Sequence, residues 1–161
     1  MIVRFETSDD IAAIRMVQEV AFGQPAEAQL VDDLRAAGDC VFSLVAVDGG
    51  IVVGHIMFSR MKAPFPALAL APVAVLPEYR RTGLASRMIQ QGIARSEAAG
   101  WRGIFVLGDG AFYRRFGFDA AKAAGFISPY AGPHLMALPL GGELPIATGI
   151  IQHAPAFAKL G

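Results

Sequence analysis

The chain has little of what several classes of protein depend on. Its one cysteine, Cys40, allows neither an internal disulfide nor a multi-cysteine metal site, and this usage is typical of a reducing compartment. No apolar run reaches the roughly 18 residues that a membrane-spanning helix requires. The N-terminal residues 1–6 have no apolar signal core, because they already carry Arg4 and Glu6. We therefore expect a cytoplasmic protein without a membrane segment.

Charge is scarce and balanced. Charged residues make up 17% of the chain, and 14 Lys+Arg stand against 14 Asp+Glu. A nucleic-acid-binding protein usually has a basic stripe, and a disordered chain usually has few apolar residues, whereas 54% of these residues are hydrophobic. The three histidines show no spacing typical of metal ligands. The composition argues against a nucleic-acid partner, a disordered chain and a metal site.

Apolar periodicity and turn residues predict a mixture of strands and helices. Thr7 with Asp10 is typical of a helix start, Pro25 suits the first turn of a second helix, and Ile14 and Val17 lie at helical spacing. The order βααβββαβαβ favours the α+β or mixed α/β class. The expected elements are strands at 2–5, 41–47, 51–61, 67–76, 103–107, 135–140 and 146–152, and helices from 11, from 25, at 80–99 and at 109–116.

We expect one domain over residues 1–161, a length that buries a sizeable core. Its C-terminal part, residues 126–161, is rich in glycine and proline. That part supplies the last strands and suits either a lid or the contact of a homodimer.

The segment 73–86 reads Val-Ala-Val-Leu-Pro-Glu-Tyr-Arg-Arg-Thr-Gly-Leu-Ala-Ser, in which a strand ends and a turn opens a helix. Free N–H groups at a helix start bind anions, and small residues such as Gly83 and Ala85 let a ligand approach them. Arg80 and Arg81, in the expected first turn, oppose the helix dipole, which indicates that an anion such as a pyrophosphate normally neutralises them. The alternative is that both arginines point into solvent.

Two motifs in this chain match one family. Arg80-x-x-Gly83-x-Ala85, behind a strand end at 73–75, resembles the acyl-CoA signature Q/R-x-x-G-x-G/A of the GNAT superfamily of N-acetyltransferases. Residues 112–118, Phe-Tyr-Arg-Arg-Phe-Gly-Phe, resemble the segment that ends in Tyr-x-x-x-Gly-Phe in these enzymes. Weaker matches at 106–109 and 153–157 are similar to a bacterial branch of largely uncharacterised acetyltransferases.

The resemblance implies a GNAT-like fold, with a central, mostly antiparallel sheet splayed between strands 4 and 5 and flanked by about four helices. In such folds the pantetheine arm of acetyl-CoA enters between those strands like an added strand. Pro72 fits a strand that makes no ladder hydrogen bonds to the fifth strand at this point, although it also fits an ordinary edge strand. The resemblance assigns pantetheine to Val73, Ala74 and Val75, and pyrophosphate to Arg80, Arg81, Thr82, Gly83, Leu84, Ala85 and Ser86.

The family's reaction is direct attack of a neutral amine on a thioester. By resemblance Tyr113 is the acid that protonates the departing thiolate, since a phenol with a pKa of about 10 stays protonated at neutral pH. The alternative is a buried aromatic residue with a satisfied hydroxyl. A backbone N–H near Val75 is the candidate donor to the oxyanion. The base or water relay stays open among Glu27, His55, Glu78 and His134, and Cys40 matches no motif for a nucleophile.

The resemblance implies an acetyl-CoA-dependent N-acetyltransferase with a small-molecule or peptide amine as acceptor. The regions that bind the acceptor in this fold, here 22–27 and 126–157, carry little concentrated charge, which disfavours a highly anionic or polycationic acceptor. Two other interpretations stay open. One is a non-catalytic acyl-CoA-binding regulatory module with the same fold, and the other is an interaction domain that binds no CoA.

Overall fold

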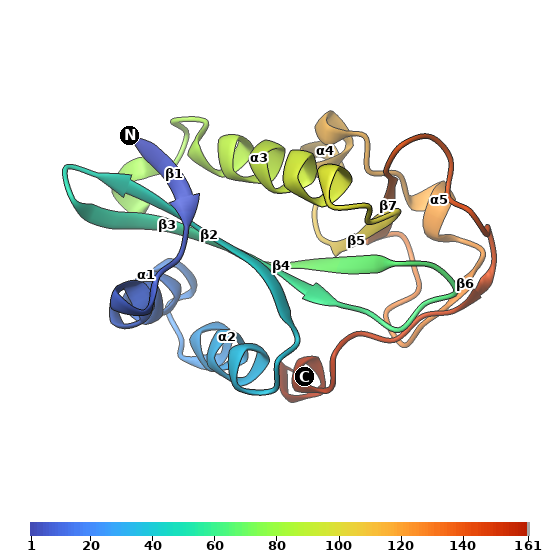
Figure 1. The fold of residues 1–161 in the computed structure, drawn as a ribbon, viewed down its shortest axis with the longest axis horizontal. Coiled ribbons are helices and arrows are strands. Elements are labelled where there is room, and N and C mark those ends of the chain that lie inside the picture. The colour runs from blue at the N-terminus through green and yellow to red at the C-terminus, as the bar shows by residue number, and fades with distance from the viewer. Residues whose placement is uncertain (161) are drawn as a thin grey trace. The chain divides into compact units, whose positions relative to one another are not determined.

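The computed structural model describes residues 1–160, which form two compact units (Figure 1). The first unit contains residues 1–59 and 71–92 and the described residues from Pro155 on, and the second contains 60–70 and 93–154. Strand β4 (Ala67–Val75) and helix α3 (Leu84–Ala98) contribute residues to both units. The single domain stays a prediction, and its last residue lies outside the described part. None of the described helices is both long and apolar enough to cross a membrane.

The first unit is built on three antiparallel strands, β1 (Ile2–Phe5), β2 (Cys40–Asp48) and β3 (Ile51–Arg60). Strand β4 follows β3 in the sheet order, and the Leu76 N–H donates to the Val53 carbonyl at 2.9 Å. The turn between β2 and β3 contains two glycines with positive φ, as the sequence predicts for a hairpin.

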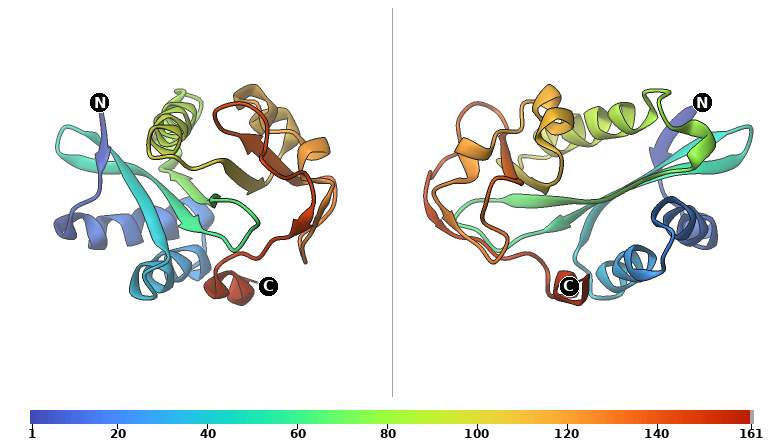
Figure 2. Two further views of the ribbon diagram at one scale, coloured as in Figure 1. Left: turned by 45° about the vertical axis from the view of Figure 1, so that its right-hand side comes forward. Right: turned by 180° about the vertical axis from the view of Figure 1, so that it is seen from behind.

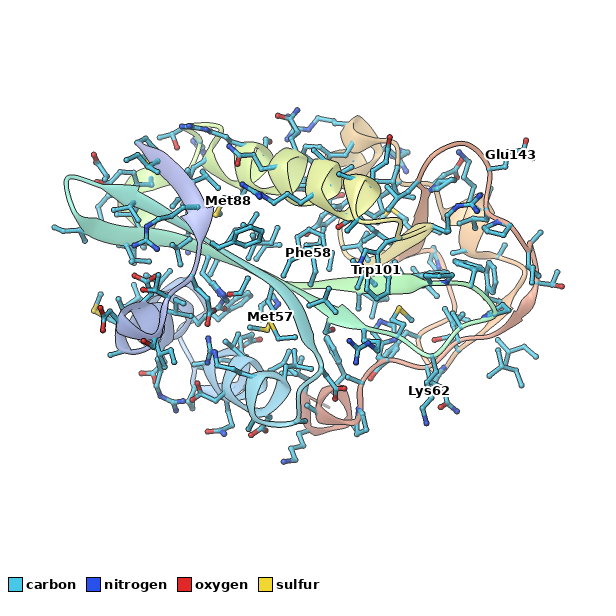
Figure 3. All side chains as sticks on the ribbon, viewed as in Figure 1. Met57, Phe58, Lys62, Met88, Trp101 and Glu143 are labelled. Atoms are coloured by element: carbon cyan, nitrogen blue, oxygen red, sulfur yellow. The ribbon has the colours of Figure 1, made fainter. Side chains whose placement is uncertain are left out.

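Two helices cover one face of these strands and the start of α3 covers the other (Figures 1 and 2). They are α1 (Ile11–Phe22) and α2 (Ala26–Ala36), which pack on each other. The Thr7/Asp10 capping box precedes α1 and confirms the predicted start. Successive residues of a strand point to opposite faces, and Figure 3 shows Met57 on the side of α2 and Phe58 on the side of α3.

The second unit contains the beginning of β4, with β5 (Gly103–Leu107) parallel to it and β7 (Leu135–Pro139) antiparallel to β5. Three phenylalanines form its aromatic core. The Phe105 ring centroid lies 6.4 Å from that of Phe65 and 5.4 Å from that of Phe126. The remaining elements here are α4 (Gly110–Tyr113), α5 (Ala120–Ala123), β6 (Phe126–Ile127) and β8 (Gly149–Ile150), of which β6 and β8 pair in parallel.

The predicted splay between the fourth and fifth strands is confirmed. Strand β4 pairs with β5 from Ala67 to Ala69, whereas β4 itself continues to Val75. Pro72, preceded by a cis peptide bond, lies beyond this pairing. A proline there removes no hydrogen bond from the β4–β5 ladder, because it has no N–H to donate.

The structure differs from the sequence predictions in four places. The long helix begins at Leu84 rather than Arg80, because Arg81 and Gly83 have positive φ values of 64° and 82° that no α-helix contains. The strand expected at 146–152 is reduced to β8. The sequence does not predict α5 and β6, since segments of four and two residues show no periodicity. The helix expected at 109–116 is divided into α4 and a 3-10 turn at Arg114–Phe116.

We predict that Gly92→Ala destabilises the protein, although alanine is normally the better helix former by about 0.5–1 kcal/mol. A Cβ at Gly92 would overlap Cε2 and Cζ of the buried Phe58 ring on β3. Overpacking of this kind costs about 1–3 kcal/mol. Thermal unfolding should show a Tm several degrees lower. Gln90→Ala, at an exposed position of the same helix, is the control and should leave Tm unchanged or slightly raised. An unchanged Tm in Gly92→Ala would contradict this packing.

Candidate functional site

The connection between β4 and α3 has an unusual backbone. A 3-10 turn at Pro77–Tyr79 is followed by Arg80 in an extended conformation, and then by Arg81 and Gly83 with positive φ. Arg81 is the one residue other than glycine with positive φ among residues 1–160. Such conformations cost energy and are common where a ligand is bound, because the surrounding contacts must hold them in place.

Side chains from other segments hold this connection. The Tyr79 hydroxyl donates to Asp48 Oδ2 at 2.6 Å, and that hydrogen bond raises the pKa of Tyr79, so the phenol stays protonated. Arg80 Nη2 donates to the Ala21 carbonyl at 3.0 Å. Within the connection, the Thr82 hydroxyl donates to the Tyr79 carbonyl. Hydrogen bonds within the chain therefore support this backbone conformation.

The geometry of residues 80–86, which we call the cofactor loop, suits an anion. The Gly83 carbonyl accepts a hydrogen bond from the Arg87 N–H at 3.0 Å in the first turn of α3. The N–H groups of Leu84 and Ala85 lie at this helix start, where backbone donors have no acceptor within the helix. A Cβ at Gly83 would meet nothing within 4 Å, so glycine is required there by its φ and the space around it is open. Left-handed residues next to a helix start turn successive N–H groups into an anion-binding concavity.

The sequence-predicted cofactor residues lie along one continuous stretch of the first unit, from the end of β4 to the first turn of α3. Leu84 is only 4% exposed and belongs to the core, so it offers a ligand its backbone alone. The two arginines lie before the helix rather than in its first turn. Arg80, Arg81, Thr82 and Gly83 are exposed, Val73, Val75, Ala85 and Ser86 are half-buried, and Ala74 is buried.

Tyr113 belongs to the second unit, at the end of α4. Its ring centroid lies 5.0 Å from that of Phe112 and 5.8 Å from that of the buried Phe118. Gly108 lets the ring lie against the backbone, since a Cβ there would overlap Tyr113 Cε2. Burial raises the pKa of Tyr113, so its phenol stays protonated at neutral pH. Sequence reasoning missed Gly108, although a glycine just after a buried strand is a signal of close approach.

Of the candidate bases, His55 is fully buried and both of its ring nitrogens are engaged. Gln18 Nε2 lies 2.8 Å from Nδ1, and Ser43 Oγ lies 2.8 Å from Nε2. The Ser43 hydroxyl donates to the Glu6 carboxylate, so Ser43 accepts from His55 Nε2–H and Gln18 donates to Nδ1. A histidine in this position cannot meet an acceptor amine and has a structural role. Glu27 accepts two hydrogen bonds from Gln24, while Glu78 and His134 are exposed.

The buried histidine gives a pH prediction. Burial lowers the pKa of His55 to about 3 and that of His153 to about 4, from an ordinary value near 6.5. Below about pH 6.5 the unfolded chain binds protons that the folded chain does not, so the free energy of unfolding falls as the pH is lowered toward these values. Each group contributes at most about 1.4 kcal/mol per pH unit.

Urea unfolding at pH 7 and pH 5 measures this decline, which should be shallower in His55→Gln because one titrating group is gone. An equal decline in that variant and in the parent protein would contradict a neutral, buried His55.

Comparison with known proteins gives consistent matches. The sequence model of the Acetyltransferase (GNAT) family matches residues 9–118, which include the cofactor loop and Tyr113. An Escherichia coli (strain K12) protein called uncharacterized N-acetyltransferase YhbS is 37% identical over 125 residues, 75% of each chain. Another protein of that strain, uncharacterized N-acetyltransferase YjhQ, is 38% identical over 133 residues, 77% of this chain and 73% of its own.

Solved structures agree with these matches. The crystal structure of the GNAT family N-acetyltransferase YhbS from Escherichia coli, in complex with CoA, has a TM-score of 0.93 and 30% identity, and covers 99% of this chain and 93% of its own. A GNAT family acetyltransferase from Brucella melitensis, in complex with acetyl-CoA, has a TM-score of 0.84 and 36% identity, with 97% of both chains covered.

Proposed function

The chain belongs to the acetyltransferase (GNAT) family, and we propose that it moves the acetyl group of acetyl-CoA directly onto a primary amine of a small molecule or a peptide. Acetyl-CoA is the co-substrate that family membership and the CoA and acetyl-CoA complexes of the two related structures indicate. The single observation that carries the proposal is the ordered cofactor loop, with its left-handed Arg81 and Gly83 in front of α3.

The cofactor loop binds the pyrophosphate of acetyl-CoA. Its backbone N–H groups supply hydrogen bonds and an exposed guanidinium supplies charge. The pantetheine arm runs along residues 73–75, where β4 extends beyond its pairing with β5. Backbone groups of Val73 and Val75 bond its amides in the manner of an added strand.

The chemical step forms a carbon–nitrogen bond and breaks the carbon–sulfur bond of the thioester. A backbone N–H near Val75 donates to the carbonyl oxygen as negative charge develops on it. Tyr113 gives its proton to the departing thiolate, since its phenol is protonated at neutral pH. The amine's own proton leaves through a base or a water relay, for which Glu27, Glu78 and His134 remain candidates.

The acceptor is an amine without strongly concentrated charge, because the regions 22–27 and 126–157 carry little charge themselves.

We assign a cytoplasmic location because the chain has one cysteine, Cys40. Burial raises the pKa of the Cys40 thiol to about 11, so this thiol is unreactive. The segment from residue 126 on is the proposed contact of a homodimer or a lid over the acceptor. A non-catalytic CoA-binding module with the same fold is the alternative, and the relatives' names as N-acetyltransferases do not favour it.

Acetyl-CoA binding tests the cofactor loop. Calorimetric titration with acetyl-CoA should show micromolar binding to the parent protein, and Arg81→Ala should weaken it about tenfold. A charge-assisted contact is worth about 1.5–3 kcal/mol, and the exposure of Arg81 to screening solvent favours the lower end of that range. Arg102→Ala removes an exposed arginine outside the loop and is the control. A folded parent protein that binds no acetyl-CoA would overturn the proposal.

Removal of the phenol hydroxyl tests the proposed acid. Tyr113→Phe keeps the ring that packs on Phe118 and removes only the hydroxyl, so acetyl-CoA affinity should be unchanged. Turnover should fall by about 10²–10⁴, the usual contribution of general acid catalysis. The release of CoA thiol during incubation with a panel of amines measures turnover. Unchanged turnover in Tyr113→Phe would remove Tyr113 from the mechanism and leave the family assignment intact.

A further inference from the structure

The two arginines of the cofactor loop have different surroundings, and we propose that they have different roles. Arg80 is a positioning residue that ties the cofactor loop to the end of α1, and Arg81 is the arginine that contacts phosphate. This inference rests on the proposed function, since it concerns the same loop. It departs from the expectation that both guanidinium groups neutralise one anion.

The partner of Arg80 is a helix end that lacks a cation of its own. Helix α1 ends at Phe22, and Gly23 follows in the left-handed conformation typical of a helix C-cap. The last four carbonyls of a helix have no donor within it, and Ala21 carries one of them. The last turn of α1 contains no basic residue. Arg80, 59 residues further along the chain, supplies both the missing hydrogen bond and the missing positive charge.

Helix α1 is the fixed side of this contact. Its Gln18 is fully buried and hydrogen bonded to His55 on β3, and its Arg15 forms an ion pair with Asp32 on α2. The cofactor loop, in contrast, is exposed from residue 80 to residue 83. The bond between Arg80 and Ala21 therefore positions the cofactor loop relative to α1.

Arg81 differs from Arg80 in the surroundings of its guanidinium. Among residues 1–160 no hydrogen bond or ion pair engages its guanidinium, and its side chain is exposed. Its backbone is held in a conformation that a glycine adopts at lower cost. An arginine kept at such a position is explained by its side chain, and a free guanidinium beside the N–H groups of α3 suits a phosphate.

The contact joins two parts of the proposed active site. Directly after Ala21 the chain passes through Gly23 and Pro25 into α2, and this junction borders the region that the family resemblance assigns to the acceptor. A ligand bound to the cofactor loop further restrains Arg80, and through its hydrogen bond the last turn of α1. Arg80 thereby makes the α1–α2 junction sensitive to occupancy of the cofactor loop.

Hydrogen–deuterium exchange with and without saturating acetyl-CoA tests this coupling in peptides that cover residues 20–25. In the parent protein, acetyl-CoA should slow exchange there. In Arg80→Ala exchange should be several-fold faster and should no longer respond to acetyl-CoA. Arg80→Lys should restore the response, because lysine also donates to a carbonyl and carries the charge. Arg81→Ala, measured at acetyl-CoA concentrations that saturate it, should respond like the parent protein.

Titration at two salt concentrations separates the roles of the two arginines. Arg81→Ala should bind acetyl-CoA about tenfold more weakly and with less dependence on salt, because a screened charge contact is lost. Arg80→Ala should keep the salt dependence of the parent protein. If Arg80→Ala instead loses affinity and salt dependence as Arg81→Ala does, with unchanged exchange at 20–25, Arg80 is a phosphate ligand and the inference is wrong. A parent protein that binds no acetyl-CoA would refute the proposed function separately, since the exchange of unliganded Arg80→Ala still tests the bond to Ala21.

Discussion

The chain must leave strand β4 and enter helix α3 in one short connection, and it does so through left-handed backbone at Arg81 and Gly83. This turn decides where α3 begins and therefore which N–H groups are free of helical partners. It also places the two arginines before the helix, where they do not interrupt its first turn. The features that make the cofactor loop suitable for an anion all depend on this backbone, and Tyr79, Arg80 and Thr82 hold it with hydrogen bonds.

Helix α1, to which Arg80 ties that turn, is itself held by a polar network in the interior of the first unit. Glu6, Ser43, His55 and Gln18 form one chain of hydrogen bonds, and Arg35 bonds Glu6 with two nitrogens at 3.0 Å. Burial opposes ionisation of Glu6, but the hydrogen bonds from Arg35 and Ser43 outweigh it and lower its pKa. Buried polar groups are expensive unless they find partners, and in this network all side-chain nitrogen and oxygen atoms but Gln18 Oε1 have one, so the network fixes α1 and α2 on the strands.

The sequence predicts the longer elements well because their apolar periodicity is strong. Strands β3 and β4 begin at the predicted residues and each ends one residue before the predicted bound, and the core positions Met88 and Ile89 of α3 are fully buried. The predicted start of α3 is too early, since periodicity carries no information on the sign of φ at Arg81. The sequence cannot predict the hydrogen bond between Arg80 and Ala21, because every residue type has a backbone carbonyl that could accept it. Motif spacing locates the cofactor loop and Tyr113 as candidates, and their roles stay predictions.

At position 81 the φ angle that the fold requires is one that an arginine adopts only at a cost. Glycine adopts φ near 64° at almost no cost, whereas other residues lose about 1–2 kcal/mol there. Sequences normally agree with their structure at every level, and a residue that breaks a local rule points to a functional constraint. The neighbouring Gly83 obeys the rule at φ 82°, so the turn itself does not demand an arginine. A contact between the Arg81 guanidinium and a phosphate, as proposed above, would balance this cost.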